Sequence, residues 1–175
     1  MGRLARWLLA WLLLCTNSLA QADEAQRQLE AVFLGRFASY VQWPHQGRPT
    51  FDIAVVGSNP FGERLNALYA DKRIQGKPVR IHLVSDVSGI GTPDVLFVAL
   101  PTVAARQAAI AHAHRHGILT VSDARGFAEQ GGIIQLSFVG QNIQIKINYD
   151  AAMKTGLQIA APLLSIATVL RESPT

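Results

Sequence analysis

Cysteine is nearly absent from this sequence, which has one, Cys15, among 175 residues. Cys15 lies within residues 1–22, a segment that has the parts of a secretory signal peptide, so we expect a mature chain without cysteine. Disulfides, on which small exported domains depend when they cannot build a core, are therefore not expected. The 153 residues that remain after removal of 22 from 175 are enough for a single domain, 23–175, with its own core.

The amino-terminal segment also lacks the length of a membrane anchor. Arg3 and Arg6 give it a positive start, residues 7–14 form an apolar run, and residues 18–22 offer small side chains for cleavage. Eight apolar residues are far fewer than the roughly 20 that span a bilayer. The segment therefore predicts a cleaved signal peptide and a periplasmic protein.

The chain has little excess charge of either sign. Its formal charge is +4, from 16 basic and 12 acidic residues, and removal of Arg3 and Arg6 leaves 14 against 12, or +2. The basic residues are scattered rather than clustered. This balance does not predict a nucleic-acid-binding protein.

Phosphate-binding loops of the dinucleotide and Walker A types are missing as well. A turn, Gly57-Ser58-Asn59, follows a predicted strand over 51–56, and Asn59 is placed to cap a helix that starts at Pro60. The amino terminus of that helix could receive an anion. An ordinary tight turn between strand and helix explains the same residues.

Three histidines, His112, His114 and His116, end a predicted helix that Thr102 caps at its start and Gly117 at its end. Imidazoles four residues apart share a helix face and could bind a metal. The helix dipole, which favours cations in the last turn, is the simpler explanation. No carboxylate or cysteine is close in sequence, so we predict neither a metal nor another cofactor.

Strand and helix patterns alternate along the chain and predict an α/β fold, a three-layer sandwich with a mostly parallel central sheet. A late antiparallel hairpin adds strands over 133–139 and 143–147, joined by a short turn that contains Gly140. An amphipathic helix over 25–40 and a terminal helix over 149–171 cover the sheet. Pro162 would kink or split the terminal helix, and part of its apolar face would remain for a dimer or another partner. The other predicted elements are strands over 79–84, 95–99 and 118–121 and helices over 60–70 and 102–116.

The most polar loop expected at the carboxyl ends of the parallel strands is 122–127, where ligands gather in such sheets. Asp123 could act as a base or bind a hydroxyl group, and Arg125 could bind a carboxylate or phosphate. Ser122 as a nucleophile would need an imidazole, but the three histidines lie roughly 13 to 17 Å away at the other end of the strand. We therefore do not expect an enzyme.

Two aromatic residues have two interpretations each: Trp43, at the end of the first predicted helix, and Phe127, in a polar loop. Either residue could complete the core, or it could stand exposed as an anchor for a partner protein. For Phe33 and Phe37, on the stripe of the first helix, core packing is expected. For Phe127, between Gly126 and Ala128 in a polar loop, our hypothesis is the exposed anchor.

The order of several short motifs resembles the YfiR-like (HmsC-related) family of periplasmic regulators over most of the mature chain. The motifs are Phe37-Ala38-Ser39-Tyr40-Val41-Gln42-Trp43-Pro44, Val55-Val56-Gly57-Ser58-Asn59-Pro60-Phe61-Gly62, Leu119-Thr120-Val121-Ser122-Asp123, Gly126-Phe127-Ala128, Gly131-Gly132, Ile145-Lys146-Ile147-Asn148 and the leucine-rich terminal helix. Each motif is nonspecific alone, but their order and spacing together are fairly specific.

The resemblance implies a non-catalytic protein that restrains an inner-membrane diguanylate cyclase by engaging its periplasmic sensor domain. Cyclic-di-GMP output and biofilm formation would fall as a result. Family members under redox control carry paired cysteines, which this mature chain lacks, so control by a disulfide is not implied here. The alternative function is a periplasmic small-solute-binding module that uses the loop 122–127.

Overall fold

The computed structural model describes residues 23–44, 47–140 and 142–171. The predicted signal peptide, residues 1–22, lies outside the described residues and stays a prediction. The described chain begins with a helix over residues 23–39. The elements that follow are β1 (Val41–Gln42), β2 (Phe51–Gly57), α2 (Arg64–Tyr69), β3 (Arg73–Ile74), β4 (Lys77–Val84), η1 (Val87–Gly89), β5 (Val95–Ala99), α3 (Val103–His116), β6 (Leu119–Ser122), β7 (Ile134–Val139), β8 (Asn142–Asn148), α4 (Tyr149–Lys154), β9 (Gln158–Ile159), α5 (Ala161–Ser165) and β10 (Thr168–Leu170).

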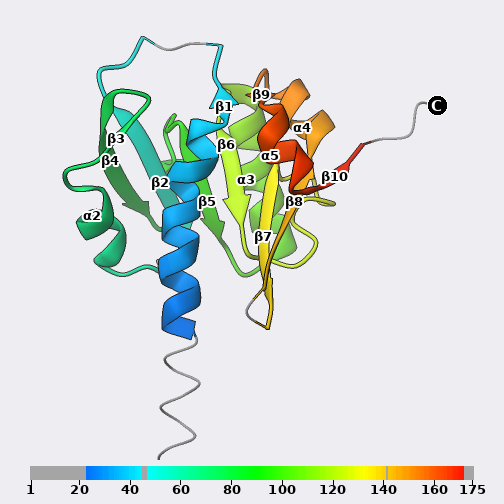
Figure 1. Ribbon diagram of the computed structural model, residues 1–175, viewed down its shortest axis with the longest axis horizontal. Helices are drawn as coiled ribbons and strands as arrows, with labels where there is room; N and C mark the ends of the chain where they lie inside the picture. Colours follow the sequence, from blue (N-terminus) through cyan, green and yellow to red (C-terminus); the bar gives the residue numbers. More distant parts are fainter. Residues whose placement is uncertain (1–22, 45–46, 141, 172–175) are drawn as a thin grey trace, which may run out of the picture.

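Eight strands form one curled sheet in the order β10-β8-β7-β6-β5-β2-β4-β3 (Figure 1). Strands β4, β2, β5, β6 and β7 run parallel, and β10 runs parallel to β8. The pairs β7–β8 and β3–β4 are antiparallel, and β1 and β9 form a separate antiparallel pair. The predicted α/β fold with a mostly parallel sheet and a late hairpin is confirmed.

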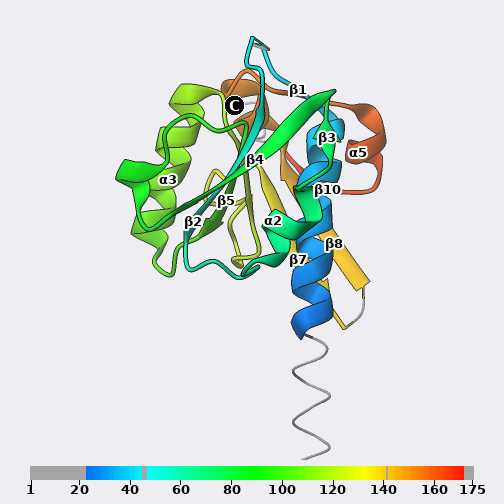
Figure 2. The same cartoon turned by 90° about the vertical axis from the view of Figure 1, so that its left-hand side faces the viewer.

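The sheet lies between two layers of helices (Figures 1 and 2). Helix 23–39, α2, α4 and α5 pack on one face, where Leu34, Leu65, Ala152 and Leu163 are buried. Helix α3 and η1 pack on the other, around Ile110. Residues 95–98 of β5 are fully buried because both faces of this central strand are covered, which explains its uninterrupted apolar sequence.

Local signals in the sequence placed several elements correctly. Thr102 caps α3, since its hydroxyl accepts a hydrogen bond from the Ala105 N–H, and Gly117 ends the helix with φ of 68°. In the hairpin Val139 pairs with Asn142, and Gly140, which follows Val139, takes a φ of 62°, as the predicted turn requires.

The prediction of one terminal helix over 149–171 was wrong. Helix α4 stops at Lys154, and Gly156 then takes a φ of 82°, which a helix cannot contain. The chain continues as β9, the five-residue α5 with its proline in the first turn, and β10. Pro162 thus lies in the first turn of a new helix, so of the two predicted effects, a kink or a split, the structure has a split.

The helix expected from Pro60 was also misplaced. Helix α2 begins at Arg64, and Glu63, its first flanking residue, makes no capping hydrogen bond through its side chain. Asn59 instead stabilises a turn, because its side chain accepts from the Phe61 N–H and donates to the Gly62 carbonyl.

Candidate functional site

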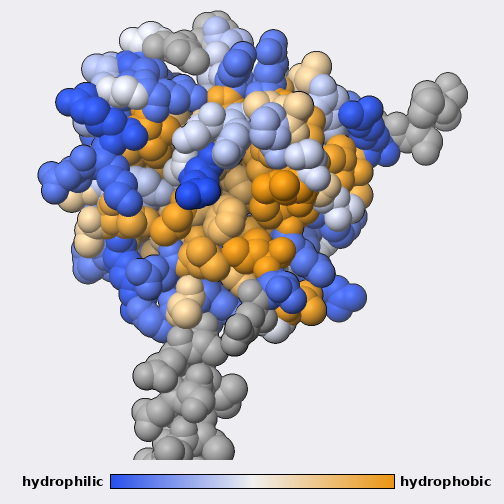
Figure 3. Space-filling model, in the orientation of Figure 1, coloured by the Kyte–Doolittle hydropathy of each residue, from blue (hydrophilic) through white to orange (hydrophobic). Residues whose placement is uncertain are grey.

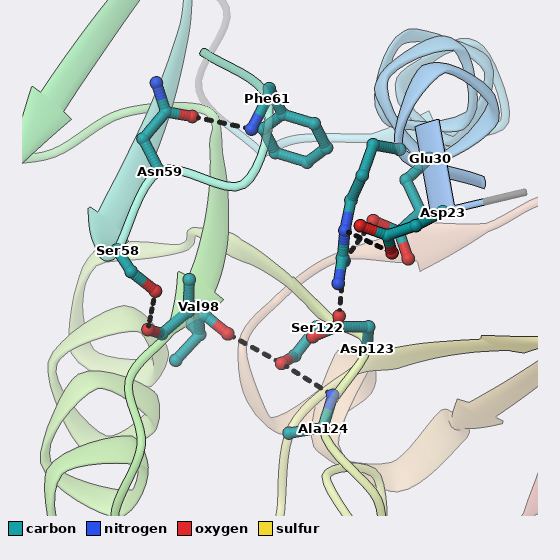
Figure 4. Close-up of polar contacts among 11 residues, drawn as sticks. Asp23, Glu30, Ser58, Asn59, Phe61, Val98, Ser122, Asp123 and Ala124 are labelled. Atoms are coloured by element: carbon teal, nitrogen blue, oxygen red, sulfur yellow. Dashed lines mark hydrogen bonds and ion pairs between the residues drawn. The ribbon is translucent and has the colours of Figure 1, made fainter. Parts of the chain in front are cut away.

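The carboxyl ends of β2, β5 and β6 meet at one edge of the sheet, as expected for parallel strands (Figure 4). The loops that leave this edge begin at Gly57, Leu100 and Ser122. Helix 23–39 brings Arg27 and Glu30 to the same place. The site is therefore built from four segments, and the helix is a component that the sequence patterns did not assign to it.

Ser122 is fully buried at the end of β6 and its hydroxyl group is occupied. It donates to the Val98 carbonyl at 2.6 Å and accepts from the Ala124 N–H at 3.1 Å (Figure 4). These bonds tie β6 to β5 and start the turn of the loop. Ser122 therefore organises the loop, and it does not face a ligand or a partner.

Asp123, the next residue, is part of a charged cluster with Arg27 and Glu30 (Figure 4). The Arg27 guanidinium donates to Asp123 at 2.6 Å and to Glu30 at 2.9 Å, and Asp23 lies 3.7 Å from it. Asp123 is about one-third exposed, whereas the Glu30 side chain is 2% exposed. One arginine thus links the first helix to the loop after β6.

Two opposing effects, burial and pairing with opposite charges, set the pKa values in this cluster. Burial raises the pKa of Glu30 to about 7, even though Arg27 favours the carboxylate. Burial also lowers the pKa of Arg27, but its hydrogen bonds with Asp123 and Glu30 outweigh this and leave the pKa raised. Arg27 is therefore always charged, and Glu30 is the member of the cluster that titrates near neutral pH.

Arg125 and Asp123 line a polar hollow of about 720 Å³ beside the hairpin. Its walls carry Gln135, Ser137, Gln144 and Lys146, the polar side chains that alternate with the apolar ones along the two strands of the hairpin. Lys146 forms an ion pair with Glu129, while Arg125 is exposed and makes no ion pair with the described residues. Asp123 and Arg125 are thus the two predicted site residues in the loop that a ligand can reach.

Phe127 is fully buried, so the hypothesis of an exposed anchor is wrong. Its ring packs in the core between the sheet and α3, with Ile110 and Ile118. The ring fits there because Gly132 lies against it: a Cβ at position 132 would stand 2.1 Å from the ring. Phe127 anchors its own loop and is unavailable to a partner.

Trp43 is 9% exposed and belongs to the core, so the structure favours the core interpretation for this residue as well. Its indole N–H donates to the Asp94 carbonyl at 3.2 Å, and its ring meets Phe51 edge-on at 5.5 Å. Phe37 is buried as predicted, and Phe33 is half-buried against the same core.

The turn Gly57-Ser58-Asn59 uses its polar groups internally. Ser58 donates to the Ala99 carbonyl, and Asn59 bonds within its own turn. A Cβ at Gly57 would lie 2.5 Å from the same carbonyl, so the turn must approach β5 closely. This geometry agrees with the ordinary tight turn.

The three histidines of α3 bond to backbone carbonyl groups. His112 contacts the Gly91 oxygen, His114 the Gly131 oxygen and His116 the His112 oxygen. Burial lowers the pKa of His114. Within the described residues no three His, Cys, Asp or Glu side chains gather in a metal-binding arrangement.

An apolar face extends over helix 23–39, the hairpin and α5 (Figure 3). The sequence patterns had predicted a free apolar surface only for the terminal segment 149–171. We define it by exposed or half-buried apolar residues of helix 23–39, the hairpin, α5 and the two positions that follow α5: Leu29, Phe33, Phe138, Ile143, Leu164, Ile166 and Ala167. Ile166 is 67% exposed and Leu29 37%. Large contiguous apolar surfaces of this kind mark interaction sites.

The comparisons with solved structures find the same fold in proteins of low sequence identity. A conserved domain protein from Vibrio cholerae O1 biovar El Tor matches with a TM-score of 0.59 and 16% identity, over 83% of this chain and 60% of that one. The "ABC domain" from Streptococcus pneumoniae, described in complex with L-Trp, matches with a TM-score of 0.56 and 13% identity, over 80% and 60%. The chain therefore corresponds to about 60% of the length of either protein.

Among curated proteins, none matches the sequence significantly. No helix in the described part of the chain is long and apolar enough to cross a membrane. A family model described as YfiR/HmsC-like matches residues 27–168, which is most of the chain. The chain belongs to the YfiR/HmsC-like family.

Proposed function

We propose that the mature protein lies in the periplasm, where it binds the periplasmic sensor domain of an inner-membrane diguanylate cyclase and represses the enzyme. Less cyclic-di-GMP and less biofilm would follow. The observation that carries the proposal is the family match over residues 27–168, because proteins of this family are periplasmic regulators of diguanylate cyclases. The protein itself would be no enzyme.

The apolar face supports a role in protein binding. It joins residues of the first helix, the hairpin and the α5 region into one surface (Figure 3). Ile166, the most exposed large apolar side chain in the described residues, lies on it. A homodimer through the same face is the competing arrangement, and sedimentation of the purified protein distinguishes the two.

The test is capture of the cyclase from detergent-solubilised envelopes by the mature protein, with identification by mass spectrometry. We expect Ile166→Glu to lose the cyclase, because a carboxylate would be desolvated in the interface. Leu83→Glu is the matched control, since Leu83 is 50% exposed on β4, away from the apolar face. Cellular cyclic-di-GMP should rise with Ile166→Glu alone. If the wild-type protein retains no diguanylate cyclase, the proposal is wrong.

A second candidate function is the binding of a small periplasmic solute in the polar hollow beside the hairpin. The observation in its favour is the lining, where the unpaired Arg125 and the amides Gln135 and Gln144 offer donors to a carboxylate. Calorimetric screening of amino acids and small organic acids, with Arg125→Ala as the control, tests this candidate.

A further inference from the structure

A groove runs along the junction between helix 23–39 and α2, on the opposite flank of that helix from the apolar face. It consists of two hollows of about 400 and 300 Å³, and Leu68 lines both of them. Figures 1 and 2 show the two helices side by side. The floor is apolar, with Ala31, Val32 and Ala67 beside Leu68.

The groove is fixed by a close contact between its two helices. The Tyr69 hydroxyl accepts from the Gly35 N–H at 2.8 Å and donates to the Ala31 carbonyl at 2.7 Å. A Cβ at position 35 would lie 2.5 Å from the Tyr69 hydroxyl oxygen, so only a glycine at this position lets the tyrosine come so close. Burial raises the pKa of Tyr69 to about 12, which keeps the donated proton in place. The groove is therefore preformed.

The two ends of the groove differ in charge. Arg36, Lys72 and Arg73 line one end, and no acidic side chain lines it. Arg36 and Lys72 make no ion pair with the described residues, and Arg73 donates only to the Gly76 carbonyl. At the other end Arg64 is neutralised by an ion pair with Glu24. An occupant would meet uncompensated positive charge at one end only.

We propose that this groove binds an amphipathic helix of the partner protein, with its apolar side on Leu68 and its acidic end at Arg36 and Lys72. A helix whose first turn is acidic suits this arrangement, because carboxylates also stabilise a helix amino terminus. From Glu24 to Arg36 the groove is about 18 Å long, which is about 12 helical residues. The assignment of this helix to the cyclase rests on the proposed function.

The peptide experiment tests the groove independently of any cyclase. The probe is a fluorescein-labelled synthetic 12-residue helix with leucines at helical spacing and three Glu in its first turn. Its partner probe has three Lys at these positions. We expect the mature protein to bind the acidic peptide at least tenfold more tightly than the basic one. Arg36→Glu and Lys72→Glu should each weaken the binding of the acidic peptide about tenfold and strengthen the binding of the basic peptide.

The matched control is Arg115→Glu, because Arg115 is an exposed cation on α3, on the other face of the sheet. It should change neither affinity. Equal affinities of the wild type for the two peptides would overturn the proposal, as would equal weakening by Arg115→Glu. A groove filled by a second copy or by a membrane would also overturn it. Sedimentation would then show a dimer that Arg36→Glu dissociates, or anionic vesicles would displace the peptide.

Capture from envelopes separates this proposal from the proposed function. If wild type retains the cyclase and Arg36→Glu loses it, the groove holds the helix of the cyclase. If both retain it equally, the assignment to the cyclase is wrong while the proposed function stands. If wild type retains none, the proposed function fails, and the peptide affinities alone decide whether the groove binds an acidic helix.

Discussion

The loop 122–127 and helix 23–39 meet at the same edge of the sheet, yet they present opposite kinds of surface. The loop has a polar sequence, but Ser122 and Phe127 are fully buried and serve the fold. The helix has an ordinary amphipathic sequence, but one of its flanks contributes to the apolar face and the other to the groove. Polar residues in a loop can thus serve as hydrogen-bond partners for the backbone. Which side chains of the loop are exposed depends on the structure around it.

The largest loss of stability is expected from Phe127→Ala, which removes the buried ring of the loop. Loss of a buried aromatic ring costs about 3 to 5 kcal/mol. For a domain of this size we expect the melting temperature to fall by about 10 °C. Val139→Ala, at a side chain that is 57% exposed, is the control and should melt like wild type. A Phe127→Ala protein with the melting temperature of the wild type would contradict the core position of Phe127 and support its role as a partner contact.

Glu30→Gln tests whether the buried carboxyl group of the charged cluster makes the free energy of unfolding depend on pH. The folded pKa, about 7, is above the ordinary 4.5, so the native state binds more protons than the unfolded state between these values. The contribution of Glu30 to stability is therefore fully present below about pH 4.5 and is lost as the pH rises through 7. Chemical denaturation at pH 5 and pH 8 should show a loss on the order of 2 kcal/mol in wild type that Glu30→Gln lacks. Equal losses in both proteins would contradict the assignment.

The ion pair between Arg27 and Asp123 joins helix 23–39 to the loop 122–127. A double-mutant cycle with Arg27→Ala and Asp123→Ala should give a coupling free energy of about 0.5 to 1 kcal/mol, because both side chains remain partly exposed. The coupling should shrink in high salt. The pair Arg80–Asp52, at the far edge of the sheet, is the reference cycle. A zero coupling for Arg27–Asp123 would show that the two regions are energetically independent.

The smallest effect on stability is expected from Arg125→Ala. Arg125 is exposed and makes no ion pair in the part of the chain that the structure describes, so the free energy of unfolding should stay within about 0.5 kcal/mol of wild type. Guanidinium denaturation measures this directly. A larger loss would mean that Arg125, like its neighbours in the loop, is part of the fold rather than of a binding surface.

Elements defined by neighbours in sequence were predictable. Strand β5 has the predicted bounds, and the caps of α3 act through bonds to residues at most four positions away. The hairpin was predictable because its alternation of apolar residues and its turn are local signals. These elements also place the loop 122–127 at the carboxyl ends of the parallel strands, as predicted.

The remaining features depend on contacts between distant segments. Strands β9 and β10 are two and three residues long and exist only because β1 and β8 pair with them. The inward position of Phe127 depends on the space beside Gly132. Arg27 joins the site through a residue 96 positions away. Periodicity along the chain contains no information about such partners.

The pairing of β1 with β9 has a consequence for how the chain folds. Val41 lies opposite Ile159, so the strand next to the first helix pairs with a strand near the end of the described chain. Closing so long a loop is entropically costly, and contacts between sequence-distant residues slow folding. Helix 23–39, whose core neighbours include Ala152 and Leu163, cannot complete its packing while the last elements are missing. A chain of this topology therefore cannot complete its core before β9 and β10, its last two strands in the described residues, have been synthesised.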